Sequence, residues 1–206
     1  MEIRNEAGQT EEEFLAEYHS IEHKYPHPSL TADVILFRRA AGKLYLLLIR
    51  RGNHPWIGMR ALPGGFVNPD ENGRQAAARE LAEETGVEGL PLAELGLYSD
   101  PGRDPRAWIV TNAYYSVYEG ELSAKAGDDA RDADWFEVQA VTRGRRLTLL
   151  LVHGDEKLPV HALLEYNTLS KRYAVTQLQS AGLACDHAKI IADAYLAVRQ
   201  PTEEIS

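Results

Sequence analysis

The stretch from Leu62 to Val87 reads LPGGFVNPDENGRQAAARELAEETGV, and its second half predicts a helix over about residues 73–85. Asn72 is a good N-cap, and Gln75, three residues later, completes a variant of the capping box. Gly86 can adopt the left-handed backbone conformation that ends a helix. The stretch therefore predicts a glycine-containing loop followed by a short, well-delimited helix.

Three glutamates gather on this expected helix. Glu80, Glu83 and Glu84 stand at positions i, i+3 and i+4, so their carboxylates share one face. Like charges at that spacing cost about 0.2–0.5 kcal/mol per pair, and the helix dipole disfavours anions in the C-terminal half. A bound cation would offset both costs. Oxygen ligands without cysteine or a nearby histidine favour Mg²⁺ or Mn²⁺.

The residues around the glutamates suit such a site. Arg79 can pair with Glu83 four residues later and hold its orientation. Gly64 and Gly65 allow the preceding loop to approach closely, so the Gly64 carbonyl can serve as another ligand. A solvated acidic helix face is the ordinary alternative, and the spacing favours the metal site over it.

Taken together, these residues resemble the Nudix box. The pattern Gly65-x5-Glu71-x7-Arg79-Glu80-Leu81-x-Glu83-Glu84-x-Gly86-Val87 fills every consensus position over 23 residues. The expected strands over about residues 30–140 are also similar to those of that domain. The resemblance implies an α/β/α sandwich with a mixed sheet. It further implies Mg²⁺- or Mn²⁺-dependent hydrolysis of nucleoside diphosphates that are linked to another moiety.

The resemblance also implies roles for single residues. The general base stays open between Glu80 and an acidic residue on a downstream loop, for which Asp128 and Asp129 are the obvious match, although an Asp-rich turn explains that pair equally well. The expected catalytic set is Arg79, Glu80, Glu83 and Asp129. The expected metal ligands are the Gly64 carbonyl, Glu80, Glu83 and Glu84, and the structural residues of the box are Gly65, Glu71 and Gly86.

A second basic loop, SDPGRDPR at residues 99–106, bears on the substrate. It resembles a loop of ADP-ribose pyrophosphatase-like members of the family and of related Nudix regulators of NAD metabolism. Arg103 and Arg106 can contact phosphate or ribose oxygens, or they can form surface pairs with aspartate. Further arginines that could line the same cleft are Arg50, Arg51 and Arg60. Candidate adenine platforms, for which core packing is the alternative, are Trp56, Tyr98 and Tyr115.

We therefore expect hydrolysis of a small nucleoside diphosphate substrate, ADP-ribose above others, to AMP and ribose 5-phosphate. The alternative is a non-catalytic ADP-ribose sensor of NAD metabolism. The segment 182–194 also resembles a helix of both groups. In the regulators a winged-helix DNA-binding domain follows, for which we expect no room here.

The remaining pattern predicts an α+β protein. We expect an N-terminal helical extension (1–29), the Nudix domain (30–140), and a C-terminal hairpin and helix (141–206) packing on the same domain. Expected strands cover residues 32–37, 44–49, a segment before Pro63, 92–98, 108–118 and a short 134–138, with a hairpin formed by 147–152 and 160–166. Expected flanking helices cover residues 11–25 and 186–199.

Composition excludes several classes of function. The 206 residues carry a formal net charge of −9, which argues against nucleic acid as the main partner. The single cysteine, Cys185, suits a reducing, cytoplasmic setting. The polar N-terminus does not resemble a signal peptide, and no apolar run is long enough to span a bilayer. Apolar surface on the N-terminal helix and on the 147–167 hairpin predicts a homodimer.

Overall fold

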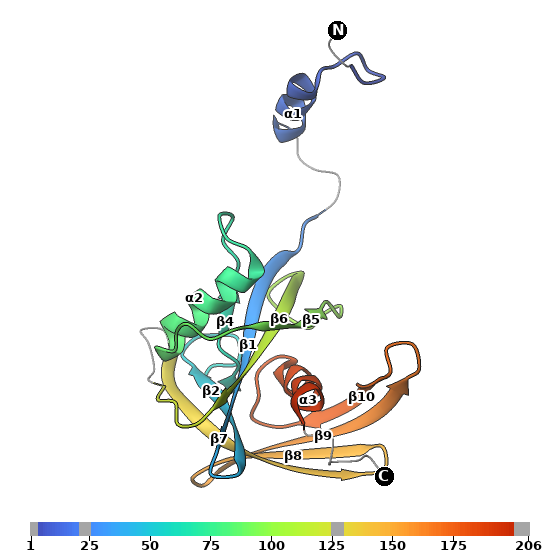
Figure 1. The fold of residues 1–206 in the computed structure, drawn as a ribbon. Helices are drawn as coiled ribbons and strands as arrows, with labels where there is room; N and C mark the ends of the chain where they lie inside the picture. Colours follow the sequence, from blue (N-terminus) through green and yellow to red (C-terminus); the bar gives the residue numbers. More distant parts are fainter. Residues whose placement is uncertain (1–3, 21–25, 125–129, 200–206) are drawn as a thin grey trace.

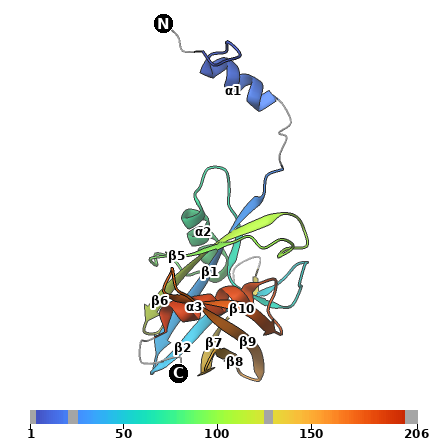
Figure 2. The same cartoon turned by 90° about the vertical axis from the view of Figure 1, so that its right-hand side faces the viewer.

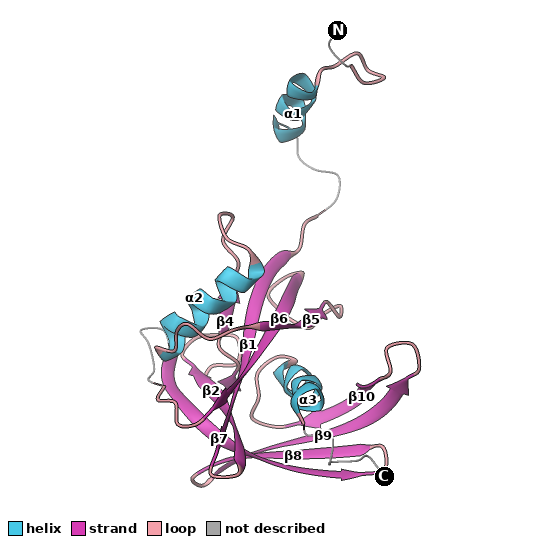
Figure 3. Cartoon of the chain, viewed as in Figure 1, coloured by secondary structure: helices cyan, strands magenta, loops and turns pink. Residues whose placement is uncertain are grey.

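The computed structural model describes residues 4–20, 26–124 and 130–199. Its centre is one mixed sheet with the strand order β10-β9-β8-β7-β2-β1-β6-β5, in which β3 pairs with β2 and β4 with β1 (Figures 1 and 3). β1 and β6 run parallel, whereas β1–β2 and β2–β7 are antiparallel. The bounds of the strands are β1 Ser29–Ala40, β2 Lys43–Arg51, β3 Arg60–Ala61, β4 Gly64–Phe66, β5 Ala93–Tyr98, β6 Ile109–Glu119, β7 Ala130–Arg143, β8 Arg146–His153, β9 Glu156–Asn167 and β10 Arg172–Ser180.

The alternation of side chains along β1 divides the core into two layers. Successive residues of a strand point to opposite faces of the sheet. Val34 and Leu36 pack with the buried residues of α2 (Gly73–Thr85). Ile35 and Phe37 pack with those of α3 (His187–Val198) on the other face. The sheet therefore lies between two helices, which confirms the expected α/β/α arrangement.

The C-terminal strands curl around α3. On β8, Leu147, Leu149 and Leu151 are buried and belong to the same core cluster as Ile190 and Ile191 of the helix. Both views show α3 above β8 and β9 (Figures 1 and 2). The expected 147–167 hairpin is confirmed, but its alternating apolar residues face the helix and do not form a free surface. The predicted homodimer stays a prediction.

The helix of the box has the expected ends. Asn72 accepts hydrogen bonds from the backbone of Arg74 and Gln75, and the Gln75 side chain accepts from the Asn72 N–H, which completes the capping box. Gly86 is left-handed, with φ +69°. These contacts fix where α2 begins and ends, and thereby fix the position of every glutamate along it.

Two strands differ from the expectations. β7 is much longer than the predicted 134–138 strand, because it extends past the buried segment to pair with β8; it also crosses the expected boundary at residue 140. β10 was not predicted, since its sequence RYAVTQLQS is mostly exposed and lacks a clear apolar alternation. Helix α1 (Glu11–Ser20) lies apart from the sheet in both views, and its Phe14, Leu15 and Tyr18 are exposed. In the parts of the chain that the structure describes, none of the helices combines the length and apolar character needed to cross a membrane.

Candidate active site

A pocket of about 220 Å³ lies where β1, β4 and the loop before α3 meet. Glu84 of the box helix reaches it, and both glycines of the LPGG turn form part of its wall. The loop that follows β2 and the loop between β5 and β6 contribute the remaining sides. The polar and aromatic lining residues are Thr31, Asp33, Arg51, Asn53, Trp56, Phe66, Glu84, Arg103, Asp104, Arg106, Cys185 and His187.

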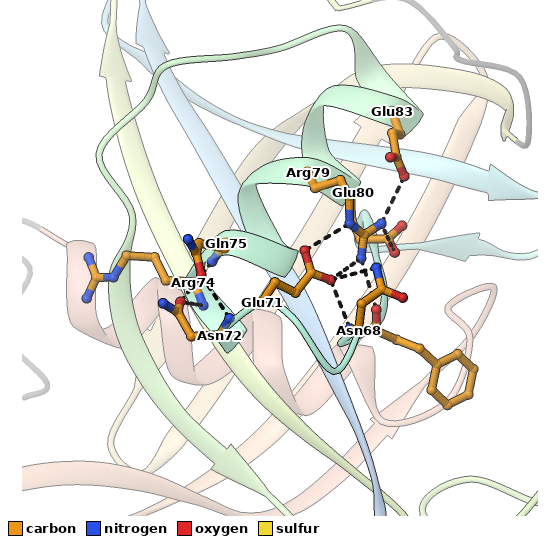
Figure 4. A network of polar contacts seen from close by, with 9 residues as sticks. Asn68, Glu71, Asn72, Arg74, Gln75, Arg79, Glu80 and Glu83 are labelled. Atoms are coloured by element: carbon orange, nitrogen blue, oxygen red, sulfur yellow. Dashed lines mark hydrogen bonds and ion pairs between the residues drawn. The ribbon is translucent and has the colours of Figure 1, made fainter.

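Beside this pocket, Arg79 links three of the four glutamates of the box, Glu71, Glu80 and Glu83 (Figure 4). Its Nη1 donates to Glu80 Oε1 at 2.7 Å and to Glu83 Oε2 at 3.0 Å. Its Nη2 donates to Glu71 Oε1 at 2.6 Å and to the Phe66 carbonyl at 3.0 Å. The Arg79–Glu83 pair is the one that their spacing of four residues predicted. The guanidinium also joins the helix to the preceding loop through Glu71 and Phe66.

Glu71 is fixed from both sides. Besides the Arg79 contacts, it accepts hydrogen bonds from the backbone and side-chain nitrogens of Asn68. Arg79 first, and then the Asn68 N–H, lower the Glu71 pKa to about 2. This carboxylate stays ionised and ties the loop down, which fits the structural role expected of it.

Two other carboxylates are enclosed with too little positive charge around them. Glu84 Oε2 accepts the Gly64 N–H at 2.9 Å, yet burial raises the Glu84 pKa to about 8. Burial also raises the pKa of Glu80, even though Arg79 opposes the shift. A cation would stabilise both ionised side chains.

The donors suit a hard divalent ion. Glu80 lies against Gly65, and Glu84 binds the neighbouring Gly64, so oxygen ligands flank the same turn. Among residues 4–20, 26–124 and 130–199, no three acidic, histidine or cysteine side chains already stand close enough to hold a metal ion. Arg79 holds Glu83 outward instead. The ligand role of the glutamates stays a prediction that the chemistry of the donors supports.

The two glycines of the turn are required for different reasons. A Cβ at Gly64 would collide with the main-chain oxygen of Ala32 and with Asp33, because Gly64 is paired with Asp33 in the antiparallel β1–β4 ladder and the two strands approach closely there. The three atoms nearest to a Cβ at Gly65 all belong to the carboxylate end of Glu80, which can rotate away. The first position therefore controls packing, and the second controls the placement of a functional side chain.

We expect Gly64→Ala to lower the free energy of unfolding by about 1–3 kcal/mol, the usual cost of forcing atoms into a packed site. Gly65→Ala should lower it by less and act mainly on activity. Urea unfolding of both variants, at equal metal concentration, measures the difference. Equal stability of Gly64→Ala and the unmodified chain would contradict the close approach of β4 to β1.

The loop arginines are at the pocket wall. Arg103 makes a two-point ion pair with Asp186, at 2.8 and 2.7 Å. The Cys185 Sγ–H donates to the Arg103 carbonyl at 2.9 Å, and burial raises the Cys185 pKa to about 12, so this thiol stays neutral. Arg106 pairs with Asp104 at 2.7 Å, and its guanidinium carbon lies 5.4 Å from the centroid of the Phe66 ring. Both arginines are therefore held in fixed positions, one buried and one partly exposed.

Arg50 and Arg60, expected to bind substrate, are elsewhere. Arg60 is 2% exposed and pairs with Asp134 and Glu156 behind β3. Arg50 pairs with Asp132 and Glu156. Neither lines the pocket. Neighbouring residues on β2 face opposite ways, so Arg51 enters the pocket and Arg50 does not; Arg60, on β3, is held away from it by Asp134 and Glu156.

Other expectations have mixed outcomes. Trp56 lines the pocket, whereas Tyr98 is buried and donates its hydroxyl to Asp193. Asp128 and Asp129, the alternative bases, lie outside the described residues. Sequence reasoning missed Asp33 and His187 as pocket residues; the one available signal was an aspartate within the apolar run 32–37.

Comparison with known proteins agrees with this geometry. A family model described as the NUDIX domain matches residues 27–157. An ADP-ribose pyrophosphatase of Methanocaldococcus jannaschii is 42% identical over 115 residues, covering 55% of this chain and 64% of that protein. An ADPR responsive transcriptional repressor, NtrR, of Acinetobacter baylyi is 32% identical over 148 residues, covering 71% and 57%. The chain thus spans about three fifths of each of these relatives.

Solved structures show the same fold. A MutT/nudix family protein from Enterococcus faecalis superposes with a TM-score of 0.73 at 37% identity, covering 92% of this chain and 70% of that one. The NUDIX domain of Shewanella oneidensis NrtR, crystallised with ADP ribose, gives 0.62 at 25% identity, with coverage of 89% and 98%.

Proposed function

This chain belongs to the Nudix family, and from that premise we propose that it hydrolyses ADP-ribose to AMP and ribose 5-phosphate with Mg²⁺ or Mn²⁺. The observation that carries the proposal is the enclosed carboxylate Glu84, shared between the box helix and an arginine-lined pocket. The similarity to an ADP-ribose pyrophosphatase and to a domain crystallised with ADP ribose supports this choice of substrate.

The pocket can hold a diphosphate through opposite charge. Arg51 and Arg106 line it, and Arg51 has no ion pair among the residues that the structure describes. Guanidinium groups suit phosphate oxygens because they present several donors in one plane. Binding the diphosphate here would bring it next to Gly64 and Glu84, where the cleavable bond must lie.

Glu80, Glu84 and the Gly64 carbonyl would hold the divalent ion, with Glu83 joining them once it leaves Arg79. When bound, the ion neutralises phosphate charge and makes a coordinated water more acidic. We assign the base role to Glu80, because Arg79 orients its carboxylate and places it against Gly65, beside the expected metal ligands.

The reaction then balances simply. The water oxygen bonds to one phosphorus, the bridging P–O bond of the diphosphate breaks, and the leaving phosphate keeps that electron pair. The water proton passes to the carboxylate and then to solvent. Arg79 keeps Glu80 aligned throughout, because its other contacts to Glu71 and Phe66 anchor it in the loop.

A sensor that binds ADP-ribose without cleaving it is the second candidate, and the similarity to NtrR favours it. Against it, every acidic position of the box is filled, and Arg79 links three of them, Glu71, Glu80 and Glu83. A pure binding site has no need for that set.

The test is to incubate the protein with ADP-ribose, NADH, nucleotide sugars and oxidised deoxynucleoside triphosphates, with Mg²⁺, Mn²⁺ or EDTA. We expect AMP from ADP-ribose with either metal and none with EDTA, as measured by chromatography. Calorimetry in EDTA gives the affinity separately. Tight ADP-ribose binding without AMP formation would support the sensor function over hydrolysis. Faster hydrolysis of another compound in the panel would show that ADP-ribose is not the preferred substrate.

A further inference from the structure

Asp33 is a buried carboxylate for which the reaction above has no use. It is 7% exposed and lines the pocket from β1. Its Oδ2 accepts a hydrogen bond from Thr111 Oγ1 at 2.7 Å. Over the described residues, Oδ1 receives no hydrogen bond, and the side chain makes no ion pair. An enclosed carboxylate normally fills its acceptor sites, so Oδ1 is ready to accept donors from a ligand.

Asp33 shares the pocket with Glu84 but lies apart from Glu80 and Arg79. Gly64 and Gly65 are neighbours on β4, so their Cβ directions point to opposite faces of that strand. A Cβ at Gly64 would meet Asp33, and a Cβ at Gly65 would meet Glu80. Asp33 therefore lies on the other face of β4 from Glu80 and Arg79, and its role is distinct from theirs.

His187, the first residue of α3, supplies a donor on the same wall. Its Nδ1 accepts the Leu62 N–H at 2.8 Å. A neutral ring that accepts at Nδ1 carries its proton on Nε2. Burial lowers the His187 pKa, against the opposing influence of Asp33, so the ring is neutral. Within the described chain, Nε2 has no hydrogen-bond acceptor, although His187 lines the pocket.

We propose, resting on the proposed function, that Asp33 and His187 bind hydroxyl groups of the sugar on the second phosphate and thereby select nucleoside diphosphate sugars over nucleoside triphosphates. A sugar hydroxyl donates to Asp33 Oδ1, and another accepts from His187 Nε2. A third phosphate has no donor to offer and brings negative charge to a buried carboxylate. The selection therefore comes from both attraction and repulsion.

The experiment compares three ligands that share the adenosine diphosphate part. These are ADP-ribose, the tetrahydrofurfuryl ester of ADP, which keeps the five-membered ring without its hydroxyl groups, and ATP. We expect the unmodified protein to prefer ADP-ribose over the ester by about 10²–10³ in kcat/KM, since sites built for hydroxyl groups strongly reject analogues that lack them. The absence of this preference would overturn the proposal.

Three variants test the two residues. Asp33→Asn keeps an acceptor for Thr111 and loses the charge. We expect it to reduce the preference for ADP-ribose over the ester to about tenfold or less and to raise the relative rate on ATP about tenfold.

Two variants separate the two nitrogens of His187. His187→Asn retains an acceptor for the Leu62 N–H and removes the Nε2 donor, whereas His187→Gln retains the donor and removes that acceptor. The first should lose the preference and the second should keep more of it.

The ester serves as an internal control for damage to the fold or the metal site. A parallel fall on all three ligands would overturn the proposal, because it would place Asp33 in packing or metal binding. Dissociation constants in EDTA separate this inference from the proposed function. Suppose that the protein binds ADP-ribose more tightly than the ester, that Asp33→Asn removes this difference, and that no AMP forms. That result would support the inference and contradict the proposed hydrolysis. If AMP forms and Asp33→Asn leaves the preference for ADP-ribose over the ester unchanged, the hydrolysis proposal stands and the inference about Asp33 is wrong.

Discussion

Glu84→Gln should reduce AMP formation from ADP-ribose by about a thousandfold at saturating Mg²⁺. A metal ion contributes several kcal/mol of charge stabilisation in the transition state, and each 1.36 kcal/mol is tenfold in rate. The amide has the same shape and can still accept the Gly64 N–H that Glu84 accepts at 2.9 Å. The loss would therefore come from the missing charge and not from a displaced loop.

The design needs a second measurement and a matched control. Mn²⁺ binding, followed by the spin resonance of the free ion, should weaken together with the rate. The unfolding midpoint in EDTA should not fall, because an amide is easier to bury than a carboxylate. Glu88→Gln, an exposed glutamate just past the helix, should leave both readouts unchanged. Turnover of Glu84→Gln within tenfold of the unmodified chain, with Mn²⁺ binding intact, would remove Glu84 from the metal site.

The second large effect is on stability. Asp186→Ala should lower the free energy of unfolding by about 3–5 kcal/mol, because it leaves Arg103 charged, buried and without its partner. The side chains of this pair are only 4% and 17% exposed. Asp186 makes no side-chain capping bond to α3, so loss of a helix cap does not contribute.

A double-mutant cycle isolates the pair. The Arg103→Ala and Asp186→Ala changes together should cost less than the sum of the single changes, since the double variant buries no uncompensated charge. Glu119→Ala is the control, because its ion pair with Arg39 is largely exposed, and it should cost less than about 1 kcal/mol. Urea unfolding supplies all the values. Additive single changes would show that the two-point contact is not coupled.

The box helix could be predicted from sequence almost residue by residue. Asn72, Gln75 and Gly86 set its ends through contacts within a few positions, and the period of the helix then places Glu80, Glu83 and Glu84. The strands with a clear apolar pattern could also be predicted, because that pattern is visible within a few consecutive residues. Exposed strands such as β10 were missed because few of their side chains enter the core.

Which polar residues face the pocket depended on the tertiary structure. Arg50 and Arg51 are adjacent and chemically identical, and only the pairing of β2 decides that Arg51 enters the pocket while Arg50 joins Glu156. His187 reaches Leu62 across 125 residues, because α3 docks in the curled sheet.

The sequence by itself thus determined the family, the acidic helix and its caps, because each rests on contacts between residues close together in the chain. The tertiary structure alone decided that Asp33, Arg103 and His187 share one pocket. Strand register and helix docking set those meetings, and both are settled by burial summed over the whole core, which no short stretch of residues encodes.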